Sequence, residues 1–575
     1  MTAVGRGTEP TATETANAGE VARRVRAEGP AARPVPAGPS LVRSSGIMAA
    51  GTLASRFTGF VRTAVLLYAI GTKDLGDAYN VANSVPNAVY NLALGGILTS
   101  VAVPLLVNAA RRHGDRGEGY DQRMFTLGVL ALGTITMIAT LAAIPITAMY
   151  GHGMPNAATY HLTVIFSYFF LPQIFFYGVS SLAGAILNSR GSFAAPMWTP
   201  VINNVVVILA AGAFVSVAGL NRTPGDVSPA EIRLLAAGTT LGIVLQTVAL
   251  VPSLRRAGFR WRPRFDFRRA EVSEIGRMSG WVFGYIVTTQ ISLVVFTIVS
   301  NDAGTRVCRS CAGAGYAAFS NAWLLFQLPY AVVGMSVITA VLPRMSAHAA
   351  EGSHQLVSSD YSAAARLSSV IVVPTALLMA VLGPPLAQAV FGHGSTSAAS
   401  ARYLGVVLAV FALGLLPYTV INLQMRVFYA MRDNRTPALI GAAAMAVRIA
   451  GSLITLAIVP PADVVAGLGV GFGLSNLATA AALGWVLNRR LGGLDVRRTR
   501  RCLVRLHLAA IPGVIFALGM SALIGAVLPA STPAALVTVA VGGSGALVLY
   551  LVSARALKID ELHQLTGMLR TRLSG

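Results

Sequence analysis

Long apolar segments recur along this chain of 575 residues, and each is long enough to cross a lipid bilayer as a helix. A membrane-spanning helix needs about 20 predominantly apolar residues, whereas a membrane-spanning strand shows about ten residues of alternating polarity. Only 11% of the residues are charged, less than half the share in a typical soluble domain. The sequence therefore predicts an all-α polytopic membrane protein with fourteen transmembrane helices. The fourteen segments cover residues 44–70, 77–108, 124–150, 160–187, 194–220, 232–254, 278–300, 313–343, 364–391, 401–430, 437–459, 464–487, 503–528 and 533–554.

Basic residues are concentrated in alternate loops between these segments. The chain has 44 Lys and Arg against 22 Asp and Glu, a net charge of +22. Arginines cluster in both tails and after the second, sixth and twelfth segments, whereas the third, eleventh and thirteenth loops have none. Because basic loops stay on the cytoplasmic side of a membrane, the pattern predicts a protein of the cytoplasmic (inner) membrane with both termini in the cytoplasm. Topology thus explains a charge that in a soluble protein would suggest nucleic-acid binding.

The two tails and one loop differ in composition from the apolar segments. Residues 1–43 contain no long apolar run, which predicts a disordered cytoplasmic tail. Residues 555–575 are predicted to form a second cytoplasmic tail. The loop at 255–277 contains eight arginines interleaved with aromatic residues. This composition predicts either an amphipathic helix on anionic lipid or an ordinary basic cytoplasmic loop, and the sequence does not choose between them.

Short signatures recur in the two halves of the chain, 237 to 242 positions apart and in unchanged order. The matched pairs are Tyr79 with Tyr316, Asn83 with Asn321, Gly95 with Gly334, Pro104 with Pro343 and Arg190 with Arg432. Two repeats of six segments each are parallel, related by an axis along the membrane normal. The sequence therefore predicts a six-helix N-lobe at 44–254, a six-helix C-lobe at 278–487 and two further helices within 488–554.

Arginine accounts for nearly all of the charge inside the predicted segments. A charge at the bilayer centre costs about 2.5–3.5 kcal/mol on insertion scales, so each such residue needs a ligand or a partner. Arg56 and Arg62 lie well inside the first segment, and Arg448 lies midway along the eleventh. Asp77 is the one carboxylate placed to reach a helix interior, and a salt bridge to Arg56 and Arg62 is the alternative to a ligand site. A cationic cavity suits an anion, above all a phosphate, which arginine binds in bidentate fashion.

Three of the arginines have a structural alternative. Arg366 and Arg426 lie near the ends of segments, and we expect their side chains to extend to the membrane interface. Arg448 is either functional or paired with a polar group such as Ser452. The near absence of carboxylates in the predicted segments argues against a transporter of cationic drugs.

Several motifs occur together in an order typical of one family. SRFTGFVR at 55–62 is followed by GDAYNVANSVPN at 76–87, GAILNSRGSFAAPMWTPVINN at 184–204 and RVFYAMRDNRTP at 426–437. With these motifs the chain resembles the MurJ/MviN lipid II flippases of the multidrug/oligosaccharidyl-lipid/polysaccharide exporter superfamily. The resemblance covers about residues 44–550. The predominance of arginine over lysine is typical of a high-GC genome and suggests an actinobacterial-type member.

The resemblance implies a V-shaped fold and a transporter rather than an enzyme. Its expected substrate is lipid II, the undecaprenyl-pyrophosphate-linked peptidoglycan precursor, moved by alternating access from the inner to the outer leaflet. The pyrophosphate agrees with the cationic interior inferred from the residues. By the same resemblance, Arg56, Arg62, Asp77 and Asn87 line the cavity, and the two helices within 488–554 form a groove for the lipid tail.

Some positions depart from the family pattern. Phe296 stands where some members carry an acidic sodium ligand, which puts sodium coupling in doubt. Leu324 stands where many members carry an arginine, and Gln327 nearby offers a polar contact. Arg448 is a conjectured replacement for a lost positive charge. The expected substrate-binding residues are Arg56, Arg62, Asp77, Asn87, Gln327 and Arg448.

Three other functions compete with this interpretation. A flippase for another polyprenyl-linked glycan would differ in the headgroup that it binds. A drug/cation antiporter of the same superfamily would need carboxylates inside the membrane. A non-transporting scaffold, whose tails dock other cell-wall synthesis or division proteins, would leave the buried arginines without a ligand.

Cys308 and Cys311 form a CxxC pair in a predicted outer loop. They predict either a small disulfide or two free thiols, and too few further ligands lie nearby for zinc. The histidines show no metal-ligand spacing, and no nucleotide-binding loop is found. The sequence therefore predicts no metal site, no cofactor and no chemistry on the substrate.

Overall fold

The computed structural model of the chain describes residues 39–90, 118–151, 154, 156–266, 269–306, 315–529 and 531–562. The chain divides into two units, Met1–Ala50 and Gly51–Gly575. Only residues 39–50 of the first unit are described, as the start of a helix. Cys308 and Cys311 lie outside the described residues, so both alternatives for this pair stay predictions.

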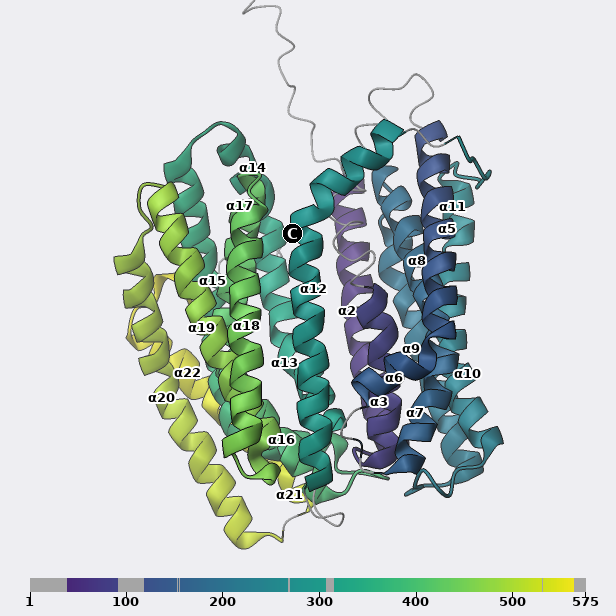
Figure 1. The fold of residues 1–575 in the computed structure, drawn as a ribbon. Coiled ribbons are helices and arrows are strands. Elements are labelled where there is room, and N and C mark those ends of the chain that lie inside the picture. Colours follow the sequence, from purple (N-terminus) through teal and green to yellow (C-terminus); the bar gives the residue numbers. More distant parts are fainter. Residues whose placement is uncertain are drawn as a thin grey trace, which may run out of the picture. The chain divides into compact units, whose positions relative to one another are not determined.

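Every regular element in the described ranges is a helix, as the sequence predicts (Figure 1). The helices of the N-half are α2 (Pro39–Ile70), α3 (Asp74–Tyr90), α5 (Glu118–Leu141), α6 (Ala143–Tyr150), α7 (Ala157–Phe170), α8 (Gln173–Ser189), α9 (Ala194–Ala218), α10 (Pro229–Val248) and α11 (Val251–Arg256). Those of the C-half are α12 (Arg269–Arg306), α13 (Tyr316–Pro329), the π-helical turn η3 (Tyr330–Gly334), α14 (Met335–Ala350), α15 (His354–Phe391), α16 (Ala398–Ala412), α17 (Leu415–Ala430), α18 (Arg435–Ile458), η4 (Pro461–Asp463) and α19 (Val464–Arg490). The last elements are α20 (Val496–Val527), α21 (Thr532–Val537), η5 (Thr538–Gly542) and α22 (Gly543–Ala556).

The number of candidate membrane spans is lower than the sequence predicts. Eleven helices in the described ranges are long and apolar enough to cross a membrane, and the pair α16–α17, bent by 51°, makes up to twelve. The predicted count of fourteen is therefore not confirmed. The two remaining predicted segments are 77–108, of which α3 covers only the first part, and 313–343, which is divided among α13, η3 and α14. Only described residues count toward these spans, and residues 91–108 of the first of these two segments lie outside them.

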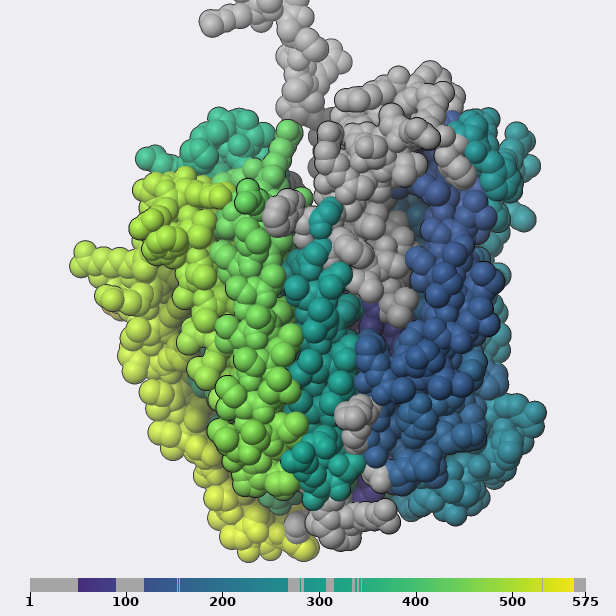
Figure 2. Space-filling view, in the orientation of Figure 1, coloured from purple at the N-terminus to yellow at the C-terminus, as the bar shows by residue number. Residues whose placement is uncertain are grey.

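Within each half, helices pack both on sequence neighbours and on helices further along the chain. In the N-half α9 packs on α10, α5 on α8 and α3 on α7. In the C-half α15 packs on α16 and α12 on α18, and the last two stand side by side in Figure 2 as teal and green columns. Helix α20 packs on both α22 and α15. Ile515 of α20 and Val548 of α22 are exposed, as expected for surfaces that face lipid.

A close approach of two helices joins α15 to α16. A Cβ atom on Gly405 would lie 2.4 Å from the carbonyl oxygen of Gly383 and 2.4 Å from the Cα atom of Pro384. We expect Gly405→Ala to destabilise the protein by about 1–3 kcal/mol, because the backbone of α15 must move to admit the methyl group. The measurement is the melting temperature of the purified protein in detergent. Gly133→Ala on α5, where nothing lies within 4 Å of the new methyl group, is the matched control. Equal melting temperatures for the two variants would contradict this close packing.

The prediction that Arg366 extends to the membrane interface is wrong. Its side chain is buried, with Nε 2.8 Å from a carboxylate oxygen of Glu561 and Nη1 3.6 Å from a carboxylate oxygen of Asp495. Both acids come from segments far along the chain, so the sequence pattern around Arg366 did not reveal them. Arg426 is half-buried on α17, and the interface position predicted for it stays a prediction.

Candidate functional site

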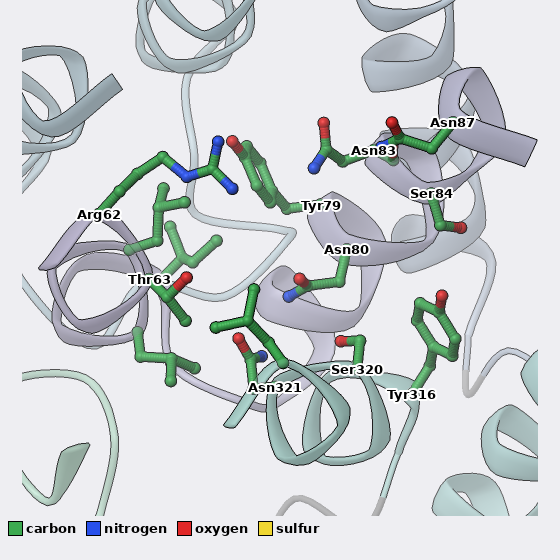
Figure 3. Close-up of a pocket in the computed structure, with 15 residues that line it drawn as sticks. Arg62, Thr63, Tyr79, Asn80, Asn83, Ser84, Asn87, Tyr316, Ser320 and Asn321 are labelled. Carbon is green, nitrogen blue, oxygen red and sulfur yellow. The ribbon is translucent and has the colours of Figure 1, made fainter. Parts of the chain in front are cut away.

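A polar cavity of about 210 Å³ lies among α2, α3 and α13 (Figure 3). Since α3 belongs to the N-half and α13 to the C-half, the cavity lies between the two halves. Its polar lining residues are Arg62, Thr63, Tyr79, Asn80, Asn83, Ser84, Asn87, Tyr316, Ser320 and Asn321. The described part of the lining contains no carboxylate. Within the described ranges, no three His, Cys, Asp or Glu side chains come close enough to hold a metal ion.

Arg62 is the one charged residue among the described residues that line this cavity. It lies on α2, and its guanidinium extends toward Tyr79 and Asn83 of α3 in Figure 3. Its Nε atom is buried and has no hydrogen-bond partner among the described residues. A buried guanidinium nitrogen without a partner is costly, and an anionic ligand in the cavity would satisfy it. The prediction that Arg62 faces a cavity is therefore consistent with its position.

The polar wall opposite Arg62 follows from the spacing of four residues on α3. Asn80, Asn83, Ser84 and Asn87 recur at intervals of three and four, which places them on one face of a helix. The amide nitrogen of Asn80 donates to the carbonyl of Gly76 at 2.8 Å, which fixes its side chain. These amides and hydroxyls, with those of α13, are neutral groups of the kind that bind sugar hydroxyls and phosphate oxygens.

Asp77 does not neutralise the arginines of α2. Among the described residues no ion pair joins it to Arg56 or Arg62; instead, its Oδ1 accepts a hydrogen bond of 2.5 Å from the backbone nitrogen of Ala317. The carboxylate thus lies at the N-terminus of α13, where a negative charge is stabilised by the helix dipole. Gly315 makes this approach possible, because a Cβ atom there would lie 2.2 Å from Asp77 Oδ2. Asp77 therefore links α3 to α13 at the edge of the cavity.

The other predicted substrate-binding residues have different positions. Asn87 lines the cavity, and its amide nitrogen donates to the Asn83 carbonyl at 3.2 Å. Arg56 is exposed on α2 and does not line the cavity. Gln327 is half-buried on α13, and Leu324, one turn earlier, lines the cavity in its place.

Arg448 lies on α18, outside this cavity. Its Nη2 donates to the side-chain oxygen of Asn476 at 2.7 Å, and its guanidinium carbon lies 4.7 Å from the ring centre of Phe472. Both partners belong to α19. The Ser452 hydroxyl, an expected partner, donates to the backbone carbonyl of Arg448 at 2.8 Å and not to the guanidinium. The substrate role of Arg448 stays a prediction.

Most of the polar wall was not predicted from the sequence. Tyr79, Asn83, Tyr316 and Asn321 were recognised only as marks of the internal repeat, yet all four line the cavity. The sequence did offer a signal, because these four residues form two of the matched pairs found 237 and 238 positions apart in the two halves. Polar residues shared by both halves were therefore the best available indication of this site.

Comparisons with known proteins agree on one family. A family model described as lipid II flippase MurJ matches residues 66–538. A probable lipid II flippase MurJ of Vibrio cholerae serotype O1 is 28% identical over 422 residues, which cover 70% of this chain and 75% of the relative. Lipid II flippase MurJ of Burkholderia cenocepacia is 26% identical over 439 residues, with 74% and 80% covered.

Solved structures show a similar fold. A lipid II flippase MurJ in an inward closed conformation superposes with a TM-score of 0.68 at 17% identity, covering 89% of this chain and 99% of that one. An inward-facing multidrug resistance transporter of the MATE family gives a TM-score of 0.61 at 16% identity, covering 76% and 94%. At these identities the likeness concerns the fold alone.

Proposed function

This chain belongs to the lipid II flippase MurJ family, whose members are transporters rather than enzymes, and we propose that it moves lipid II across the cytoplasmic membrane. The substrate is the undecaprenyl-pyrophosphate-linked peptidoglycan precursor, carried from the inner to the outer leaflet. The observation that carries the proposal is Arg62, whose buried Nε has no partner among the described residues and whose cavity has no carboxylate among its described lining residues. The same cavity does not favour a cation antiporter, because a cation would find no counter-charge there.

Two parts of the headgroup, the pyrophosphate and the peptide, bind to different residues of α2. Arg62 holds the pyrophosphate in bidentate fashion, while Asn83 and Asn321 contact it from the two halves. Arg56 lies six residues earlier on α2, about 9 Å along the helix axis and about 120° around it. It therefore contacts a different part of the substrate, the carboxylates of the peptide. The lipid tail stays in the bilayer, along a groove at α20 and α22.

Transport proceeds by alternating access between the halves. Several contacts join the halves at one end: Asp77 with Ala317, Thr396 Oγ1 with the Leu67 carbonyl at 2.6 Å, and Ser395 Oγ with the Ala69 carbonyl at 2.9 Å. With both termini in the cytoplasm, α2 ends and α13 begins on the outer side. These contacts then close the outer side of the cavity, and they must break for the headgroup to leave.

The function is tested by expressing the chain in a bacterial strain depleted of its own lipid II flippase. We expect lipid II to become accessible again in the outer leaflet, measured by its cleavage with an added enzyme that cannot cross the membrane. A strain with the empty vector is the control. If the chain is present in the membrane and lipid II stays inaccessible, the proposal fails.

A further inference from the structure

A second pocket, of about 690 Å³, lies in the N-half and shares no lining residue with the polar cavity. Helices α5, α8, α10 and α11 and residues 259–261 surround it. Its lining is mostly aromatic and aliphatic, with Phe125, Phe175 and Trp261 among its members. The volume lies in the range of pockets that hold small molecules, and the apolar lining suits a hydrocarbon chain.

One wall of this pocket is an irregular segment, residues 259–266, which forms hydrogen bonds with buried side chains of α5. Residues 259–266 have no regular secondary structure, so no amphipathic helix forms over this part of the basic loop at 255–277. Gln122 donates to the carbonyl of Arg260 at 2.8 Å and accepts from the backbone nitrogen of Arg262 at 2.7 Å. Thr126 Oγ1 accepts from the indole nitrogen of Trp261 at 3.2 Å. Because Gln122 and Thr126 are themselves buried, the wall has a defined position.

Aromatic contacts fix the side chains of this segment. The ring centre of Phe125 lies 5.4 Å from that of Phe259 and 5.5 Å from that of Trp261, both edge to face. Trp261 nevertheless remains 46% exposed. Its ring therefore lies at the edge of the pocket. One part of the ring packs against Phe125, and the exposed part can contact a ligand.

The rim of the pocket is strongly cationic. Arg255 and Arg260 line it, and the ten residues 255–264 include five arginines and no acidic residue. The side chains of Arg255 and Arg260 are exposed, and neither forms an ion pair with a described residue. Two free guanidinium groups beside an apolar pocket match a molecule with an anionic head and a hydrocarbon tail.

We propose that this pocket binds an anionic phospholipid, with one acyl chain among Phe125, Phe175 and Trp261 and the phosphate at Arg255 and Arg260. The lipid comes from the leaflet that faces the basic loop, and it is distinct from the transported substrate, whose headgroup binds at Arg62. The bound lipid covers the apolar pocket and neutralises the rim. An arginine near an anionic membrane surface contributes about fivefold to affinity, so two contribute about 30-fold.

The test uses the fluorescence of Trp261. The full chain is reconstituted in phosphatidylcholine vesicles with increasing fractions of phosphatidylglycerol brominated on its acyl chains, which quenches nearby tryptophans. The Trp261→Phe variant supplies the signal of the other four tryptophans, and the difference isolates Trp261. We expect saturable quenching at low fractions of brominated phosphatidylglycerol, and much weaker quenching by brominated phosphatidylcholine at the same fractions.

Charge variants separate specific binding from general attraction to the membrane. The Arg255→Gln/Arg260→Gln variant should need about 30-fold more brominated phosphatidylglycerol for the same quenching. The Arg497→Gln/Arg500→Gln variant removes two exposed arginines at the start of α20 and should change the titration less than threefold. Equal quenching by the two lipids, or no effect of the first variant, would overturn the proposal. So would release of the quenching by added undecaprenyl pyrophosphate, because the pocket would then hold the tail of the substrate.

Discussion

Replacing Arg62 with alanine is expected to reduce lipid II transport by about 10- to 100-fold at unchanged expression. The substitution removes the one charged side chain found among the described residues that line the polar cavity. A hydrogen bond to a charged group contributes about 1.5–3 kcal/mol, which corresponds to this range of affinity. The measurement is the amount of lipid II accessible in the outer leaflet of the depleted strain. Arg62→Lys keeps the charge but cannot bind a phosphate in bidentate fashion, so its transport should be intermediate.

The matched control for Arg62 is Arg233→Ala. Arg233 is exposed on α10 of the same half, outside the cavity, and its Nε donates to the carbonyl of Pro229 at 3.1 Å. Its loss removes an equal charge and should leave transport unchanged. Full growth and full lipid II accessibility with Arg62→Ala would show that the headgroup binds elsewhere in the chain.

Replacing Asp77 with alanine is expected to open the outer side of the cavity. The change leaves the backbone nitrogen of Ala317 without its acceptor and removes a carboxylate from the N-terminus of α13. Loss of such a cap costs about 1–2 kcal/mol, which shifts a two-state equilibrium about 5- to 30-fold. The closed arrangement of α3 and α13 would become correspondingly less populated. Asp77→Asn keeps an acceptor oxygen and should stay closer to the unmodified protein.

The position of the cavity makes this opening measurable. Ser320 lines the cavity on α13, the helix that Asp77 contacts. A cysteine at this position can be labelled in a chain whose Cys308, Cys311 and Cys502 are changed to serine. A maleimide reagent that cannot cross the membrane is added from outside. Asp77→Ala should raise the labelling rate by the same 5- to 30-fold factor. An unchanged rate would mean that other contacts, such as Thr396 with Leu67, hold the halves closed without Asp77.

How much of the site the sequence could predict depended on the kind of residue. Arg62 was predictable because a charge inside an apolar segment is costly wherever the helix lies. Asn83 and Asn321 were not predicted to line the site. A neutral amide inside a membrane helix costs much less free energy than a charge, so its presence does not by itself indicate a ligand. Their repetition at matched positions of the two halves was the only indication.

The partners of charged residues were the least predictable feature. A salt bridge from Asp77 to Arg56 and Arg62 was the alternative to a ligand site, but its Oδ1 accepts a hydrogen bond from the nitrogen of Ala317, 240 residues away. Arg366 likewise meets Glu561, 195 residues away. Such contacts depend on which helices pack together, and this packing cannot be predicted from the sequence around a single residue.

By itself, the sequence determined that this chain is all-helical and membrane-embedded and that its interior carries arginines with few acids to neutralise them. Those properties follow from hydropathy and charge, which act on each segment separately. Only the tertiary structure decided that Arg62 shares a cavity with α3 and α13 while Arg448 packs against Asn476 and Phe472. The physical reason is that a buried charge requires a partner, and which partner it finds is settled by the packing of helices that are distant in sequence.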